Sequence, residues 1–404
     1  MDEEQRKRQL RRKRILERKK RKQRQLIVII IAVIAAVLLV VLLAQHIIKT
    51  SNNAKNQNSV ATSEEGNLVE KKIDAMLDSM TLEEKVGQMF LARVPESPQQ
   101  GDIKTYHLGG YLMFARDFEG ETPDSLKEKI EGFQSASSIP MFIASDEEGG
   151  EVTRISNVSG LTSSSFQSPQ ALYAQGGLDA IKSDADSKSQ ILKNYGINYN
   201  LAPVADVATD PNSFIYSRTL GQGADETSKY IRMVVEVMKN DKIGCCLKHF
   251  PGYGDNGDSH GAIITDNRDL ASFQASDFLP FQAGIDAGAD SVLVTHNIVT
   301  CLDGTEPSSL SKAVHDYLRN DMHFTGVIIT DDFDMEGLSD FIDQNNGAIK
   351  SIQAGNDITI SSSYSQQIPT VIKAVQDGTI SEDTIDASVR RILKMKINLG
   401  IITI

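Results

Sequence analysis

The richest concentration of chemically useful side chains lies in Lys248–His260, which reads KHFPGYGDNGDSH. It follows Ile243–Leu247, a short apolar run with the character of a buried strand. The glycines and Pro251 indicate irregular backbone, on which functional side chains are often presented. Asp258 and His260 lie two residues apart, so extended backbone would place them on the same side. The carboxylate could hold one ring nitrogen while the other moves a proton; a capped turn with incidental charges is the alternative interpretation.

Titratable side chains also follow other short apolar runs. Asp146 and its neighbours follow Met141–Ala144, His296 follows Ser291–Val294, and Asp331 with Asp332 and Asp334 follows Val327–Ile329. A helix cap is a sufficient explanation for one charged strand end. Four such ends, with Lys248 and His249 counted, indicate a common site if all the strands end on one side.

The elements that would position these groups alternate along the chain from about residue 68 onward. The apolar runs are Gly110–Phe114, Met141–Ala144, Ile197–Val204, Ile243–Leu247, Ser291–Val294, Val327–Ile329 and Ile358–Ile360, with segments of helical spacing between them. This alternation predicts a parallel sheet covered by helices. Seven or eight units fit a closed barrel better than an open sheet, which would need a glycine-rich phosphate turn that is not evident. Because all strands of such a barrel end at one rim, the titratable groups would converge on one mouth.

The composition is that of a globular protein with unevenly distributed charge. Hydrophobic residues make up 40% and charged residues 24% of the 404 residues, so a substantial core is expected. Residues 1–24 carry a net charge of +9, which leaves −21 on the remaining 380 residues. So acidic a body is unsuited to nucleic acid, and no nucleic-acid partner is expected. The three cysteines, two of them adjacent, cannot form a disulfide framework.

An uninterrupted apolar segment follows the basic N-terminus. Leu26–Ala44 is nineteen residues without charge, glycine or proline, and as a helix it would span roughly 28 Å, close to the hydrocarbon thickness of a bilayer. We therefore predict a basic cytoplasmic segment at 1–25, a transmembrane signal anchor at 26–48, a flexible linker at 49–67 and one catalytic domain at 68–404. The cations before the span predict a single-pass cell-membrane protein with a cytoplasmic N-terminus and an extracellular catalytic domain. A cleaved signal peptide and a basic RNA-binding arm before a buried helix are the alternatives.

The predicted fold class is thus α/β: a (β/α)8 TIM-type barrel forming a single catalytic domain, preceded by one transmembrane helix. The residue types at its mouth suit cleavage of a glycosidic bond, which uses two carboxylates or one carboxylate with a proton donor. A retaining enzyme needs a carboxylate nucleophile on a rigid element, and Asp331 at the end of its strand meets that demand best. Asp332 should point the opposite way, as a helix cap or as an acceptor behind the site.

The sequence resembles glycoside hydrolase family 3, in particular its single-domain β-N-acetylglucosaminidase (NagZ-type) branch. The resemblance extends from about Thr81 to near Leu399. The motifs that carry it are Gly109–Phe114, Asp146–Gly150 with Arg154, Ser217–Gly221, Lys248–Gly252, Asp258–His260 and Ile329–Met335. Together and in this order they are highly specific.

The resemblance implies a role for each matching residue. Asp331 corresponds to the nucleophile that forms a covalent glycosyl-enzyme, and His260 to the general acid/base with Asp258 as its partner. Five further residues correspond to contacts with the sugar hydroxyls and the N-acetyl group: Asp146, Arg154, Arg218, Lys248 and His249. No metal and no cofactor are implied. Tyr253 stands where the family usually has histidine, and it would either stack on a sugar or pack the loop closed.

The resulting prediction is a retaining exo-β-N-acetylhexosaminidase acting on terminal β-linked N-acetylglucosamine, with peptidoglycan fragments suggested by the predicted topology. We expect a carbohydrate substrate, a membrane contact through the N-terminal helix, and a monomeric catalytic domain. A β-N-acetylglucosaminide phosphorylase or a β-glucosidase on the same fold is the alternative. Two further alternatives are a non-catalytic wall-binding module and a metal-dependent hydrolase using His249, Asp255, Asp258, His260 and Asp331.

Overall fold

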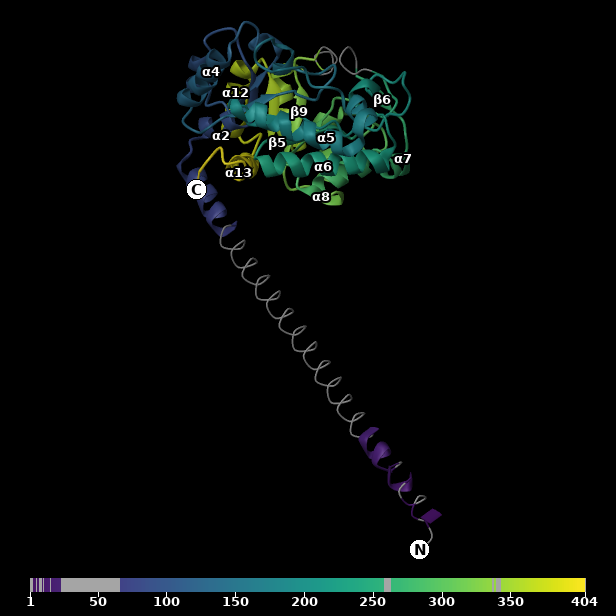
Figure 1. Cartoon of the computed structure of the whole chain (residues 1–404). Coiled ribbons are helices and arrows are strands. Elements are labelled where there is room, and N and C mark those ends of the chain that lie inside the picture. Colours follow the sequence, from purple (N-terminus) through teal and green to yellow (C-terminus); the bar gives the residue numbers. More distant parts are fainter. Residues whose placement is uncertain are drawn as a thin grey trace. The chain divides into compact units, whose positions relative to one another are not determined.

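The computed structural model describes residues 3, 4, 6, 9, 11–14, 16–22, 66–257, 263–335, 338 and 343–403. The chain divides into two compact units, Met1–Leu68 and Val69–Ile404. Figure 1 shows the second unit as strands surrounded by helices. Its apolar strands and the inner faces of its helices share one continuous hydrophobic core.

In the described part of the chain, eight parallel strands close into a barrel. They are β1 (Phe90–Arg93), β2 (Gly110–Met113), β3 (Phe142–Ser145), β4 (Tyr199–Asn200), β5 (Gly244–Phe250), β7 (Ser291–Val294), β9 (Val327–Asp332) and β10 (Ile358–Ser361). Neighbours around the barrel follow the order of the chain, and β1 closes the ring by pairing with β10, Leu91 beside Ile360. This is the α/β barrel that the alternating pattern predicts.

Helices cover the barrel on its outside. They are α2 (Leu82–Gln88), α3 (Gln99–Tyr106), α4 (Pro123–Ala136), α5 (Pro169–Asn194), α6 (Ala224–Asp241), α7 (Leu270–Ala275), α8 (Phe278–Ala287), α9 (Lys312–Asp316), α11 (Gln344–Ala354), α12 (Tyr364–Gln376) and α13 (Glu382–Asn398). Residues 66–79 are helical as well. A capping box begins α2: the amide of Glu84 donates to the Thr81 hydroxyl, and the amide of Thr81 donates to the Glu84 carboxylate.

A short two-stranded sheet stands apart from the barrel. In it β6 (Thr265–Asp266) runs parallel to β8 (Ile298–Val299). It joins the segment that follows β5 to the segment that follows β7. The predicted dyad residues Asp258 and His260 lie outside the described residues.

The prediction of a membrane-spanning helix before the barrel is corrected. Within the residues that the structure describes, none of the helices has both the length and the apolar character needed to cross a bilayer. The residues described between positions 3 and 22 are helical and exposed. The anchor predicted at 26–48 lies outside the described residues. The predictions of a membrane partner and of a cell-membrane localisation, with a cytoplasmic N-terminus and an extracellular domain, are corrected with it.

Candidate active site

A cavity of about 380 Å³ opens where the barrel strands end. Six of the eight predicted site residues line it: Asp146, Arg154, Arg218, Lys248, His249 and Asp331. They come from the ends of β3, β5 and β9 and from the segments that follow β3 and β4. The barrel therefore brings together side chains that are up to 185 positions apart in the sequence, as the convergence of strand ends requires.

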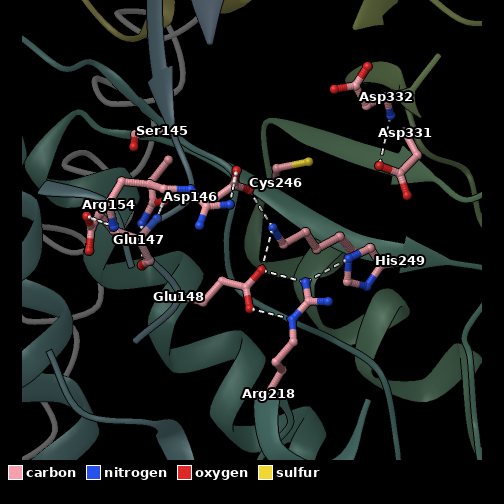
Figure 2. A network of polar contacts seen from close by, with 12 residues as sticks. Ser145, Asp146, Glu147, Glu148, Arg154, Arg218, Cys246, His249, Asp331 and Asp332 are labelled. Carbon is pink, nitrogen blue, oxygen red and sulfur yellow. Dashed lines mark hydrogen bonds and ion pairs between the residues drawn. The ribbon is translucent and has the colours of Figure 1, made fainter. Parts of the chain in front are cut away.

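Part of the cavity lining is a network of ion pairs centred on Lys248 and Glu148. Figure 2 shows Glu148 beside Arg218 and His249. The Lys248 ammonium lies 2.8 Å from Asp146 Oδ1 and 2.6 Å from Glu148 Oε1. The Arg218 guanidinium donates to both oxygens of Glu148, with Nε at 2.9 Å and Nη2 at 2.7 Å. This fork-to-fork geometry is the strongest form of an arginine–carboxylate pair.

The network holds Glu148 and Lys248 in their charged forms. Burial alone would raise the pKa of Glu148, but the charges of Lys248 and Arg218 outweigh it and hold the pKa well below its ordinary value. Burial likewise opposes the charge of Lys248, and Asp146 and Glu148 outweigh it, so that the pKa of Lys248 is raised. A site of this kind presents fixed charges and hydrogen-bonding groups around neutral pH.

Two consecutive glycines shape the segment after β3. Gly149 and Gly150 have φ of +101° and +72°, a region that glycine enters without strain. The amides of Glu148 and Gly149 both donate to the carbonyl of Val152, at 3.0 and 3.2 Å. This tight turn brings Arg154 back to the cavity, where its Nη2 lies 3.4 Å from Asp146 Oδ2.

Glu147 and Asp206 support the site from behind. Glu147 is fully buried and accepts hydrogen bonds from the amides of Arg154 and Ser156, at 2.6 and 3.3 Å. Asp206 accepts from the backbone amide of His249 at 3.0 Å and from that of Tyr253 at 2.8 Å. These carboxylates fix the backbone of the two segments that carry the cavity side chains.

The ring of His249 is held at both nitrogens. Nδ1 lies 2.8 Å from Asp206 Oδ2, and Nε2 lies 3.1 Å from Arg218 Nη2. Because a guanidinium can only donate, Nε2 is the acceptor and the ring proton resides on Nδ1. His249 therefore stabilises the arginine as well as lining the cavity.

β9 supplies two adjacent carboxylates, which point in different directions in Figure 2. The amide of Asp332 donates to Asp331 Oδ1 at 2.9 Å, and the amide of Asp334 donates to Asp332 Oδ1 at 3.0 Å. Asp332 was expected behind the site, but it lines the cavity together with Asp331. Burial raises the pKa of Asp332 to about 7, although the Asp334 amide and Arg93 oppose the rise.

Sequence reasoning missed Arg93, Glu148 and Asp206 as site residues. Arg93 ends β1, a strand of four residues that directly follows α2 and is not among the predicted apolar runs. Glu148 lies in an acidic run in which the pattern does not tell one carboxylate from another. Asp206 comes two residues after a predicted apolar run, a signal that could have been used.

Tyr253 is buried rather than presented to the cavity. Its hydroxyl lies 3.0 Å from Thr295 Oγ1, and its ring meets that of His249 edge to face at 5.3 Å. Of the two roles considered for Tyr253, packing within the loop is the one that this environment supports. Among the described residues, no group of three or more histidine, cysteine, aspartate or glutamate side chains is arranged to hold a metal ion.

Known proteins resemble this chain over most of its length. A model of the "Glycosyl hydrolase family 3 N terminal domain" matches residues 81–395. Beta-hexosaminidase LpqI of Mycobacterium tuberculosis is 27% identical over 326 residues, which cover 78% of this chain and 82% of that protein. Beta-hexosaminidase A of Pseudoalteromonas piscicida is 28% identical over 326 residues, covering 74% of this chain. The match spans only about half of that second relative, 54% of its length.

A solved structure gives the same result in three dimensions. The family 3 β-N-acetylglucosaminidase from a Paenibacillus species superposes with a TM-score of 0.75 at 28% sequence identity. The superposition covers 81% of this chain and 65% of the other.

Proposed function

This chain belongs to glycosyl hydrolase family 3, and we propose that it is a retaining β-N-acetylhexosaminidase that removes terminal β-linked N-acetylglucosamine. The observation that carries the proposal is the position of Asp331. It ends a barrel strand and lines the same cavity as the Asp146, Lys248 and Arg218 network. The hexosaminidase names of the relatives support this sugar and this reaction over the phosphorylase and β-glucosidase alternatives.

In the proposed mechanism Asp331 attacks the anomeric carbon. A bond forms between its carboxylate oxygen and C1 while the bond from C1 to the leaving oxygen breaks. The protonated imidazole of His260, oriented by Asp258, gives its proton to that oxygen and then takes one from the water that hydrolyses the glycosyl-enzyme. Asp331 suits the first step because it extends from a hydrogen-bonded strand and is held by the Asp332 amide.

The remaining proposed contacts hold the sugar. Asp146, Lys248 and Arg154 supply a carboxylate and two cations at one side of the cavity, a set that both accepts from and donates to hydroxyl groups. Because Glu148 and Asp206 already fix these side chains or their supports, little reorganisation is needed when a sugar binds. Peptidoglycan fragments were suggested as the substrate by the predicted membrane topology alone, and the proposed function does not include them.

The test uses the full-length chain and 4-nitrophenyl β-N-acetylglucosaminide, with and without phosphate. We expect phosphate-independent release of nitrophenol, and Asp331→Ala should lose a factor on the order of 10³ or more, as removal of a covalent nucleophile does. Asp286→Ala is the control, since that aspartate is half exposed on α8, away from the cavity.

A second substrate with a poorer leaving group tests the role of His260 as the general acid. His260→Ala should lose about 10²-fold or more on an alkyl glycoside, and less on the nitrophenyl glycoside, which needs little protonation. Phosphate-dependent formation of a sugar 1-phosphate, or full activity of Asp331→Ala, would show the proposed reaction to be wrong.

A further inference from the structure

Two arginine–aspartate pairs lie near the Phe114 ring. Arg154 pairs with Asp146 at 3.4 Å, and Arg93 pairs with Asp332 at 3.5 Å. The guanidinium carbon of Arg93 lies 4.4 Å from the centroid of the Phe114 ring, and that of Arg154 lies 5.5 Å from it. All five residues line the same cavity. The proposed function uses the first pair to hold sugar hydroxyls and gives the second pair no role.

The second pair bridges the rim of the barrel across one strand. β10 lies between β1 and β9, with Ile360 beside Leu91 on one side and beside Asp332 on the other. Arg93 is two residues beyond Leu91, so its side chain extends over the end of β10 toward Asp332. Ile360 lines the cavity beneath them. The two charged groups thus form one wall of the cavity near Asp331.

The Arg93–Asp332 pair is less completely hydrogen-bonded than the Arg218–Glu148 pair. Arg218 and Glu148 make two hydrogen bonds at 2.9 and 2.7 Å. The Arg93 Nε is buried and has no hydrogen-bond partner in the described part of the chain, although it forms an ion pair with Asp332 Oδ2 at 3.5 Å. A buried N–H without a partner is costly, which favours a ligand atom or water that satisfies it.

We propose that Arg93 and Asp332 form a second hydroxyl-binding pair of the active site. One sugar hydroxyl accepts a hydrogen bond from the Arg93 guanidinium and donates one to the Asp332 carboxylate. The pair carries no net charge when both groups are ionised, which suits a neutral hydroxyl rather than an anion. The assignment rests on the proposed function, and it makes Arg93 and Asp332 determinants of which sugar is accepted.

A cycle of substrate and enzyme changes tests this contact. The substrates are 4-nitrophenyl β-N-acetylglucosaminide and its 3-, 4- and 6-deoxy analogues, and the full-length variants are Arg93→Met and Asp332→Asn. In the unmodified protein, loss of the bound hydroxyl should lower kcat/KM about 10-fold or more, because a site built for a hydroxyl rejects the analogue that lacks it. In both variants that same loss should shrink to about 2-fold or less, since the contact is already gone.

Arg116→Met is the matched control. Arg116 is another guanidinium of this region, half exposed, and it donates to the carbonyl of Val94 without lining the cavity. All deoxy effects should persist in this variant. Arg93→Lys keeps the cation but not the planar fork, and should retain part of the hydroxyl dependence; it also serves if Arg93→Met does not fold.

The outcomes separate this inference from the proposed function. If the unmodified protein cleaves the substrate but every deoxy effect persists in the Arg93 and Asp332 variants, the pair is structural and the inference is overturned. If no β-N-acetylglucosaminide is cleaved, the proposed function fails instead. In that case the affinities for N-acetylglucosamine and its deoxy analogues are measured by calorimetry, in the unmodified protein and in the variants. The affinity lost on removing the bound hydroxyl should again be much smaller in the Arg93 and Asp332 variants.

Discussion

At the scale of single residues, the site depends on one buried carboxylate that two cations contact. Glu148 is 1% exposed and compensates both Lys248 and Arg218. Removing one member of a buried ionic network leaves the other charges uncompensated, which is costly even where the intact network adds little stability. Glu148 is therefore more important to the site than its absence from the predicted site residues suggests.

Glu148→Gln tests this role. The substitution keeps the shape but removes the charge, and we expect the free energy of unfolding to fall by about 3–5 kcal/mol. KM should rise because Lys248 and Arg218 lose the group that positions them. Urea unfolding and steady-state kinetics measure the two effects. Glu151→Gln, at an exposed neighbour that accepts from the Ser217 hydroxyl, should change stability by less than about 0.5 kcal/mol.

Asp332 gives the site a pH dependence near neutrality. Its pKa is about 7 in the folded protein and about 4 in an unfolded chain. Between these values the folded state binds more protons, so the contribution of Asp332 to stability is present at pH 4 and is lost as the pH rises to about 7. The groups that face this carboxyl are Arg93, Asp331 and Asp334.

Asp332→Asn removes that titration. We expect the melting temperature of the variant, relative to the unmodified protein, to be higher at pH 8 than at pH 4 by a few degrees, about what 1–2 kcal/mol gives in a chain of this size. Thermal unfolding at the two pH values measures the difference. A pH-independent difference would contradict the raised pKa, and Asp286→Asn on the surface serves as the control.

At the scale of elements, the turn after β3 determines where Asp146, Glu148 and Arg154 lie. Gly149 has a positive φ, and a Cβ at this position would lie 2.2 Å from the carbonyl oxygen of Gln167. The turn is therefore constrained both by its backbone conformation and by the close approach of a second segment.

Gly149→Ala combines the strain of a positive φ with a steric clash against Gln167, whereas Gly160→Ala causes only the strain. Gly160 also has a positive φ, +92°, but a Cβ there would meet nothing within 4 Å. We expect Gly160→Ala to cost about 1–2 kcal/mol of stability, and Gly149→Ala about 3 kcal/mol or more, because overpacking adds to the strain. Urea unfolding measures both, and equal losses would mean that the contact with Gln167 is unimportant.

The elements also show how far the sequence could be interpreted. Strands of continuous apolar residues were found, and with them the rim on which Asp146, Lys248 and Asp331 meet. The sequence did not reveal β1, because four residues directly after a short helix give no periodicity of their own. Arg93 was missed with it. The predicted ends of β5 and β9 are too early, because strand pairing continues through polar residues when a neighbouring segment supplies hydrogen-bond partners. The amide of Ala205, beyond the end of β4, donates in this way to the Lys248 carbonyl at 2.7 Å.

The direction of a side chain was harder to predict than its position in the chain. Asp332 was expected to point away from Asp331 and out of the site. The two carboxylates do diverge, yet both reach the cavity, because Asp332 is the last residue of β9 and faces Arg93 across the end of β10. Such a contact between distant strands cannot be inferred from the alternation of a single strand.

At the scale of the whole domain, Lys396 links the last helix to the start of the barrel. This side chain of α13 is fully buried, and its ammonium donates to Gln88 Oε1 of α2 at 2.6 Å and lies 4.9 Å from the ring of Phe142. Burial lowers the pKa of Lys396 to about 7. An unfolded lysine keeps its proton to about pH 10.4, so the unfolded state binds more protons between these values and stability rises with pH.

Lys396→Met removes this charge from the core. Relative to the unmodified protein, we expect the variant to gain stability at pH 6 and the gain to shrink by at least about 1 kcal/mol at pH 9. Urea unfolding at both pH values measures the change. Lys394→Met on the same helix alters a half-exposed lysine that pairs with Glu70, and it should show no such pH dependence.

The alternation of charge around the cavity has a consequence for how a substrate arrives. Among the described residues, the cavity lining contains four cationic and five acidic side chains: Arg93, Arg154, Arg218 and Lys248, against Asp146, Glu148, Asp331, Asp332 and Asp334. Opposite charges at this spacing cancel within a few ångströms, so little field extends into the solvent. A neutral sugar is then neither drawn in nor turned away at long range. Its diffusional encounter with the enzyme should be almost independent of ionic strength, however acidic the surrounding surface.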